Sequence, residues 1–306
     1  MVKCKACEKE YETDRKLHAH LKAHKMKMED YYYQYEPRKD LFTGEFIYFK
    51  SKDFYFSNDF NSKDNMRKWL KAQPQEKQKE YLFNLLQKRK EKHKIEYTPT
   101  EVELRSISSP PLSYYNSVLG SYYDTCKKLN FKNKYEYPTK PLQFKIKKGF
   151  KIFIDTREQQ PLEIDYPTEV RGLKFGDYAL NDPDNKCYIE RKSIKDFIGT
   201  LSGGYERFCR EIERAIAANA HLVVLVESPL SDCLNFNKVE EVFKKTQVTP
   251  EYIFFHVREI IQKYPEIQFL FVKGREESVR VMKKIFFCES EFKKYDLQLM
   301  YNLKLL

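Results

Sequence analysis

The chain has 306 residues, with 56 Lys and Arg against 45 Asp and Glu, which gives a formal charge of +11. This length accommodates two or three compact domains. The positive charge favours polyanionic partners, with nucleic acid first and an anionic membrane second. The sequence contains no run of about 18 apolar residues, which excludes a membrane-spanning helix, and its start, MVKCKACEKE, is not typical of a signal sequence. We therefore expect an intracellular protein of the cytoplasm, nucleoid or nucleus that is neither secreted nor embedded in a membrane.

Residues 1–25 contain a metal-binding pattern. Two residues separate Cys4 from Cys7, twelve separate Cys7 from His20, and three separate His20 from His24. Thiolates from a hairpin and imidazoles from successive helical turns can then form a tetrahedral Zn²⁺ site. The segment closely resembles a Cys₂His₂ zinc finger. We expect a ββα finger with structural Zn²⁺, because so small a core does not fold without the metal.

The helix of this predicted finger carries basic residues. The resemblance places Tyr11 and Leu17 at the two apolar core positions of a finger, and Arg15 and Lys16 on the face that contacts phosphates or bases. A lone finger spans only about 3 bp, too few to specify a rare DNA site. DNA and a protein partner therefore both stay open as its target.

Residues 26–94 are predicted to form a linker, a small hairpin and basic helices. The stretch YYYQYEPRKDLFTGEFIYFKSKDFYF has strand-like runs punctuated by Pro37 and Gly44. Between residues 63 and 94 there are 11 Lys and Arg against 4 Asp and Glu, with apolar residues at helical intervals. Arg67 and Lys68 are candidates for contact with DNA phosphates. A solvated helix face is the alternative interpretation of these charges.

Residues 95–137 show three short helical patterns, which are broken by Pro110, Pro111 and Gly120. This order is typical of a helix-turn-helix-like DNA-binding unit. The stretch LGSYYDTCKKLNF also resembles small repeats that accompany the nuclease domains of homing endonucleases and help to hold DNA. A purely structural helical spacer is the alternative.

Residues 150–306 are predicted to form an α/β domain. Four strands are expected in KIFIDTRE, YIERKS, AHLVVLVES and FLFVKG, with helical stretches between them. Apolar runs of this length indicate strands covered on both faces, and so a central sheet flanked by helices. The five cysteines that follow the predicted finger are expected to be small buried hydrophobes.

Three polar residues of this last domain indicate phosphodiester hydrolysis. Strand alternation puts Glu190 and Lys192 on the same face. Asp177, at the end of one strand, and Glu190, on its hairpin partner, can hold a hard divalent cation through oxygen ligands. Lys192 beside them can orient or activate a water molecule. A surface ion-pair cluster is the alternative.

The segments FIDTREQQP, GDYAL and YIERKSIKDFIGTL resemble the signature of the XPF-type structure-specific endonucleases, from about Lys151 to about Phe287. The resemblance implies a restriction-endonuclease-like fold that uses Mg²⁺ or Mn²⁺, with Asp177 and Glu190 as metal ligands and Lys192 as the catalytic lysine. It also implies supporting roles at five positions: Asp155, Arg157, Glu158, Arg191 and Asp196. Beyond them, Arg207 and Arg210 lie on a predicted helix, where they either contact DNA phosphate or form a solvated face.

The function implied by this resemblance is a metal-dependent DNA endonuclease for branched, flapped or otherwise distorted DNA in repair or recombination. A free-standing homing endonuclease that cuts a specific sequence is a second hypothesis. A non-catalytic DNA-binding scaffold is a third, against which the complete polar set argues. A homodimer or a protein partner through the nuclease domain is left open. We expect residues 1–135 to carry most of the DNA affinity, because the helix-hairpin-helix elements common in this family are not found after Gly274.

Overall fold

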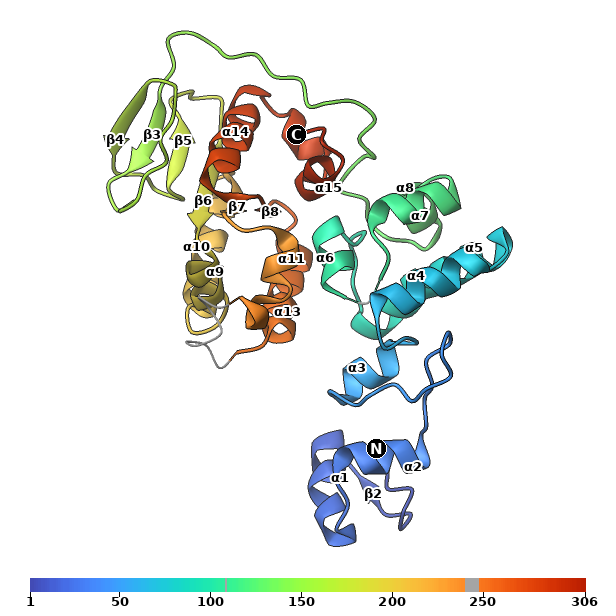
Figure 1. Cartoon of the computed structure of the whole chain (residues 1–306). Helices are drawn as coiled ribbons and strands as arrows, with labels where there is room; N and C mark the ends of the chain where they lie inside the picture. The colour runs from blue at the N-terminus through green and yellow to red at the C-terminus, as the bar shows by residue number, and fades with distance from the viewer. Residues whose placement is uncertain (108, 240–247) are drawn as a thin grey trace. The chain divides into compact units, whose positions relative to one another are not determined.

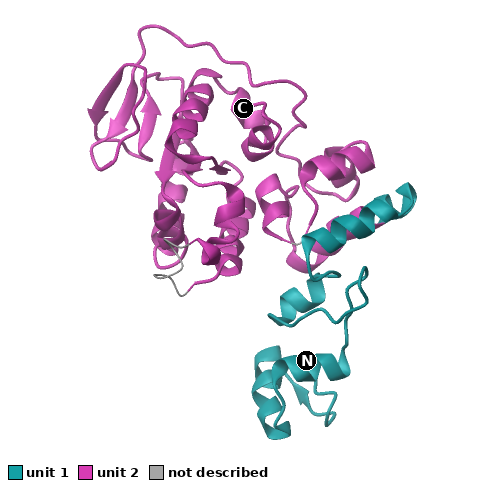
Figure 2. Ribbon diagram, viewed as in Figure 1, with its two compact units in different colours: residues 1–80 teal, residues 81–306 magenta. Residues whose placement is uncertain are grey.

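The computed structural model describes residues 1–107, 109–239 and 248–306. The chain divides into two compact units, residues 1–80 and residues 81–306 (Figure 2). Helix α5 (Gln75–His93) crosses the boundary between them. Within the described ranges, no helix has both the length and the apolar character that a membrane crossing requires.

The first unit begins with a ββα arrangement. Strands β1 (Val2–Lys3) and β2 (Glu10–Tyr11) pair antiparallel, and helix α1 (Asp14–His20) and a 3-10 turn η1 (Leu21–His24) follow. The side chain of Thr13 caps α1 by accepting a hydrogen bond from the Lys16 amide. The predicted hairpin followed by a helix is therefore present, with its last turn wound more tightly than an α-helix.

The aromatic segment after this arrangement is helical at its two ends, so the predicted strand-like runs are wrong there, whereas an antiparallel bridge between the ends retains part of the predicted small hairpin. Helix α2 (Met28–Tyr35) holds YYYQY, α3 (Lys52–Ser57) holds KDFYFS, and strand-type pairing is confined to a bridge between Lys39 and Phe46. Tyr and Phe favour strands in isolation, but burial of their rings in a shared core decides the local structure here. Helix α4 (Lys63–Ala72) and α5 then supply the two predicted basic helices.

The hydrophobic core of the first unit continues past residue 25. The amide of Lys5 donates a hydrogen bond to the Tyr31 hydroxyl at 2.8 Å, and the ring of His18 lies 2.9 Å from the Tyr32 hydroxyl. One buried cluster combines residues of the hairpin, of α1 and η1 and of the aromatic segment: Cys4, Leu17, Leu21, Tyr31, Tyr32, Ile47 and Tyr55. The predicted finger thus shares its core with the residues that follow it.

The second unit is built around a six-stranded sheet of order β4-β3-β5-β6-β7-β8 (Figure 1). The strands are β3 (Ile152–Asp155), β4 (Thr168–Arg171), β5 (Tyr178–Leu180), β6 (Cys187–Lys192), β7 (His221–Val226) and β8 (Gln268–Phe271). Strand β5 runs antiparallel to both of its neighbours, whereas β6, β7 and β8 are parallel, as are β3 and β4.

Helices cover both faces of the central strands. Leu222, Val224 and Val226 of β7 pack with α9 (Ile194–Leu201), α10 (Tyr205–Ala217), α11 (Leu230–Cys233) and α13 (Pro250–Lys263). The alternate residues Val223 and Leu225 pack with α14 (Gly274–Phe287) and α15 (Leu297–Asn302). Short 3-10 turns, η2 (Phe236–Lys238) and η3 (Glu291–Lys294), complete this part.

This arrangement confirms the predicted α/β class with a central sheet between helices. Strand β4, at one edge of the sheet, is not covered, since its four residues are all exposed. The prediction of buried cysteines is also confirmed for all five: Cys126, Cys187, Cys209, Cys233 and Cys288.

The three helices predicted within residues 95–137 are present as α6 (Glu101–Ser106), α7 (Leu112–Leu119) and α8 (Tyr122–Lys128). They belong to the same compact unit as the sheet, so no unit boundary lies at residues 137–150. Glu101 connects α6 to α7 and to the C-terminal part of the chain. Its amide donates a hydrogen bond to the Asp296 carboxylate at 2.7 Å. Its carboxylate accepts hydrogen bonds from the Leu112 amide at 2.8 Å and from the Asn302 side chain at 2.9 Å. Burial raises the pKa of Glu101 to about 7.

Candidate functional site

A tight hairpin places Asp177 beside β6. Gly176 has φ +59°, and a Cβ there would lie 2.8 Å from the carbonyl oxygen of Ile189, so a side chain is sterically excluded. The Asp177 amide donates to the same oxygen at 2.8 Å, and Tyr178 then pairs with Ile189 in the β5–β6 ladder. The hairpin partnership predicted for Asp177 and Glu190 is therefore confirmed.

Asp177, Glu190 and Lys192 come together at this hairpin. The Asp177 carboxylate accepts a hydrogen bond from the Arg191 amide at 2.8 Å. Burial raises the pKa of Asp177 well above its usual range, and the charge of Glu190 raises it further. Lys192 Nζ pairs with Glu190 Oε1 at 2.7 Å and lies over the Phe208 ring, 5.3 Å from its centroid. The ion pair confirms that Glu190 and Lys192 share one face of β6.

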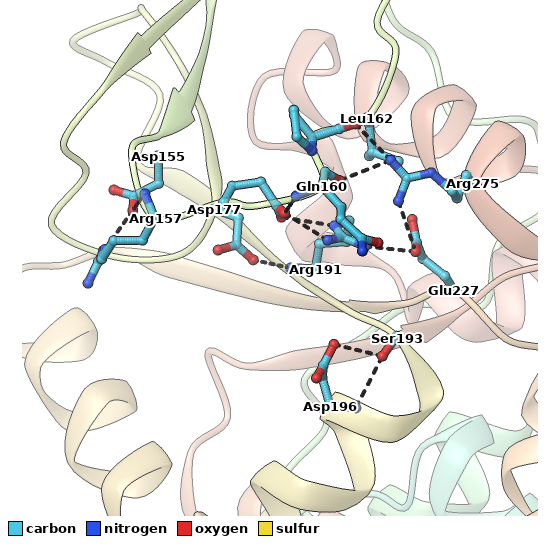
Figure 3. Close-up of polar contacts among 12 residues, drawn as sticks. Asp155, Arg157, Gln160, Leu162, Asp177, Arg191, Ser193, Asp196, Glu227 and Arg275 are labelled. Carbon is cyan, nitrogen blue, oxygen red and sulfur yellow. Dashed lines mark hydrogen bonds and ion pairs between the residues drawn. The ribbon is translucent and has the colours of Figure 1, made fainter. Parts of the chain in front are cut away.

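The Asp155 carboxylate makes its hydrogen bonds within the protein, to Arg157 and Leu173, rather than pointing towards a ligand. Its Oδ1 accepts from the Arg157 amide at 2.9 Å and from Arg157 Nε at 2.6 Å, and its Oδ2 accepts from the Leu173 amide at 2.6 Å (Figure 3). Burial raises the pKa of Asp155, but these hydrogen bonds outweigh burial and hold it below its usual range. The Asp155 amide also donates to the Asp177 carbonyl at 2.8 Å, which fixes the two loops side by side. The Arg157 side chain stays 71% exposed.

Arg191 is clamped between two carboxylates, Glu158 and Glu227. It donates to Glu158 through Nε at 2.9 Å and Nη2 at 2.8 Å, and to Glu227 through Nη1 at 2.8 Å. Arg275 adds a contact to Glu227 at 3.5 Å and donates to the carbonyl of Gln160 at 2.9 Å (Figure 3). The clamp holds the Arg191 side chain away from Asp177 while its backbone amide faces that carboxylate.

Glu227 and Arg275 were not predicted from the sequence. Glu227 follows the buried strand β7 directly, just as Asp155 ends β3, and a charged residue at the end of an apolar run is the signal that could have identified it. Arg275 begins α14 and has no such local signal.

Asp196 does not join Asp177 and Glu190. It is exposed in the first turn of α9, where its carboxylate accepts from the Ser193 hydroxyl at 2.6 Å and its amide donates to Ser193 Oγ at 3.2 Å. Figure 3 shows this pair apart from Asp177. In this structure Asp196 therefore contacts Ser193, the residue that caps α9, rather than the Asp177–Glu190 pair.

The Asp177–Glu190 pair fits a hard divalent cation. Both groups offer carboxylate oxygens, the ligands that Mg²⁺ and Mn²⁺ prefer. The repulsion between their charges is relieved when a cation binds. Asp155 is less suited to bind the cation, because its two carboxylate oxygens already accept three hydrogen bonds, two from Arg157 and one from Leu173.

A second polar cluster lies in the first unit. The ligand atoms of Cys4, Cys7, His20 and His24 all lie within 4.8 Å of one another, the one such convergence of three or more His, Cys, Asp or Glu among the described residues. Cys7 Sγ is 3.2 Å from His20 Nε2, and Cys4 Sγ is 3.6 Å from His24 Nε2. Burial lowers the pKa of His20, and the charge of His24 lowers it further, which favours the neutral imidazole that binds metal. Two thiolates and two imidazoles suit Zn²⁺.

The residues predicted to contact DNA are all exposed and lie on three helices: Arg15 and Lys16 on α1, Arg67 and Lys68 on α4, and Arg207 and Arg210 on α10. Lys16 is paired with Glu12, and Arg67 lies 3.5 Å from Asp64. Arg207 and Arg210 line a shallow pocket on the surface of α10 together with Glu213, Arg214 and Ala217.

The sequence of residues 154–285 matches a family model described as the ERCC4 domain. This stretch runs from β3 into α14. The match contains every residue of the site from Asp155 to Arg275 and confirms the resemblance expected from the three motifs.

Similar solved structures include "XPF from Aeropyrum pernix" and "XPF from Aeropyrum pernix, complex with DNA". Each is 17% identical to this chain with a TM-score of 0.34, and each match covers 44% of this chain. The chain spans 64% and 62% of their respective lengths. A search of curated proteins found no match.

Proposed function

We propose that the chain is a metal-dependent DNA endonuclease that hydrolyses phosphodiester bonds in branched, flapped or otherwise distorted DNA. The observation that carries this proposal is the convergence of Asp177, Glu190 and Lys192 on the β5–β6 hairpin, within the stretch that matches the ERCC4 domain. A chain with a formal charge of +11 is electrostatically suited to DNA.

In the proposed mechanism, Asp177 and Glu190 hold Mg²⁺ or Mn²⁺, which supplies charge neutralisation at the phosphoryl oxygens. Lys192 keeps its ammonium group beside Glu190, where it donates a hydrogen bond to the attacking water or to the developing negative charge. The Phe208 ring shields the Lys192 side chain from bulk water. The guanidinium of Arg157 is held by Asp155 and the Leu173 carbonyl but remains exposed, so it can also meet a phosphate of the bound strand, and the clamped Arg191 keeps the hairpin rigid.

A structural Zn²⁺ at Cys4, Cys7, His20 and His24 is a further part of the proposal, supported by their convergence. Because Arg15 and Lys16 are exposed on α1, a homing-type endonuclease that reads a sequence is the second candidate function. Cleavage mapping on one long natural DNA separates the two candidates. Cuts at defined sequences indicate homing, whereas cuts at branches and flaps indicate a structure-specific enzyme.

The test of the active site uses Glu190→Gln and Lys192→Ala. Both variants should lose cleavage of flap and junction DNA in Mg²⁺ by a factor of about 10³ or more, because loss of a metal-assisted step costs several kcal/mol in the barrier. DNA binding and thermal unfolding should stay close to wild type for Glu190→Gln. Glu206→Gln and Lys195→Ala are matched controls, since both residues are exposed on the adjacent helices α10 and α9. Cleavage retained by Glu190→Gln would remove the proposed site.

A further inference from the structure

Helix α10 faces the part of β6 that carries Glu190. Tyr188, Glu190 and Lys192 project from one face of β6 because side chains alternate along a strand. At one end of this row, Lys192 lies over the ring of Phe208. At the other end, Tyr188 packs against the small cluster that contains Ala215. Phe208 and Ala215 both lie on α10, so the helix passes near both ends of the row.

The helical repeat places Glu211 opposite Glu190. Phe208, Glu211 and Ala215 lie on one face of α10, because residues three, four and seven apart are neighbours on a helix. Phe208 meets Lys192, and Ala215 belongs to the cluster that Tyr188 packs against. Glu211, one turn from each, therefore faces the residue between Tyr188 and Lys192, which is Glu190.

The surroundings of Glu211 agree with this placement. Burial raises the pKa of Glu211, and the charge of Glu190 raises it further, while Lys192, Arg214 and Arg157 oppose the rise. The side chain is half-buried. Within the described part of the chain, no hydrogen bond or ion pair holds its carboxylate. A half-buried carboxylate that faces another carboxylate and lacks a partner costs stability unless a cation binds nearby.

We propose that Glu211 lies beside the divalent-cation site of Asp177 and Glu190, outside its ligand set, and strengthens binding of Mg²⁺ or Mn²⁺ from α10 through its charge. The inference rests on the proposed function and adds a residue outside the hairpin motifs. Mg²⁺ takes few protein ligands and keeps several waters, so a carboxylate one layer out acts through its charge and through hydrogen bonds to the hydration shell.

The test measures Mn²⁺ affinity of the full-length, zinc-loaded protein without DNA, by calorimetry and by electron paramagnetic resonance. Glu211→Gln should weaken Mn²⁺ binding by about tenfold, the scale of outer-shell changes at metal sites. The control Glu206→Gln removes the same charge from an exposed position of the same helix and should leave the affinity unchanged. The unfolding temperature without divalent cations should stay the same or rise in Glu211→Gln, because a like-charge contact is removed.

Three outcomes overturn this inference. The first is Mn²⁺ binding by Glu211→Gln at wild-type affinity while Glu190→Gln is weakened, which leaves the proposed nuclease site intact. The second is an equal weakening in Glu206→Gln, which reduces the effect to net charge. The third is a fall in unfolding temperature together with affinity, which makes Glu211 a structural residue. If Glu190→Gln also binds Mn²⁺ normally, the proposed function fails together with the inference.

Discussion

The Cys/His cluster of the first unit and the carboxylate site of the second differ in how the protein balances their charge. Around the carboxylate site, Glu190 has Lys192, and Glu158 and Glu227 share Arg191. In the other cluster, Cys4, Cys7, His20 and His24 face one another at 2.9–3.6 Å. We therefore expect the carboxylate site to keep its structure without an ion, and the Cys/His cluster to need a metal to hold its ligands together. Metal is thus expected to serve chemistry in one unit and folding in the other.

The largest expected effect is that of zinc removal. A structural Zn²⁺ contributes on the order of 10 kcal/mol, so Cys7→Ser should lose the metal and unfold the hairpin and α1. Protection of amides in residues 1–25 against hydrogen exchange should collapse, while that of the sheet in residues 152–271 should be unchanged. Cys126→Ser, which alters a buried cysteine of the second unit, serves as the control and should keep one zinc per chain. Unchanged zinc content in Cys7→Ser would contradict the assignment.

The carboxylate site should instead be disrupted most by a change in its backbone at Gly176. Gly176→Ala introduces a Cβ at 2.8 Å from the Ile189 carbonyl at φ +59°, and should lower the free energy of unfolding by about 2–4 kcal/mol. Gly172→Ala is the matched control, since no atom lies within 4 Å of a Cβ there. Urea unfolding of the second unit measures both variants. Equal stability of the two would show that the hairpin is not constrained at Gly176.

A third prediction concerns Glu101, a buried carboxylate near the cation Arg105. Burial raises the pKa of Glu101 by more than Arg105 lowers it. Its pKa rises from 4.5 in the unfolded chain to about 7 in the folded one. The folded state therefore binds more protons between these values, and stability falls as the pH rises from about 4.5 to about 7. A shift of this size corresponds to roughly 3 kcal/mol.

Glu101→Gln should flatten this pH dependence in urea titrations at pH 5 and pH 7. Buried Asp296, whose pKa burial also raises, retains its own contribution, so the slope should decrease rather than vanish. A slope identical to that of the wild-type protein would show that Glu101 titrates normally.

The smallest expected effect concerns DNA contact by the basic helices. In the Glu190→Gln background, Arg67→Ala with Lys68→Ala should make the salt dependence of duplex binding shallower by about 1.8, because each phosphate contact contributes a slope of roughly −0.9. Lys293→Ala with Lys294→Ala removes the same charge from η3 and should leave the slope unchanged. Equal effects of the two pairs would indicate a response to net charge alone.

The sequence determined the features that depend on local geometry. Glu190 and Lys192 lie two residues apart on a strand, so alternation alone puts them on one face. Cys4, Cys7, His20 and His24 converge because a hairpin and a helix bring ligands together at fixed spacing. Four of the six strands, β3, β6, β7 and β8, and the helices α6 to α8 could likewise be placed from apolar runs and breakers, whereas the exposed strand β4 was not predicted.

Only the tertiary structure decided which distant groups meet these residues. Arg275 reaches Glu227 from α14, and Glu211 faces Glu190 from α10, and neither approach leaves a local trace in the sequence. The two ends of the aromatic segment, in α2 and α3, fold into helices against the β-propensity of their residues, because burial of Tyr31, Tyr32 and Tyr55 in a shared core outweighs that preference. Glu101 of α6 contacts Asn302 of α15, because a buried carboxylate is tolerated only where donors supply its hydrogen bonds. Donors such as Asn302 are distant in the sequence, so the sequence alone did not reveal them.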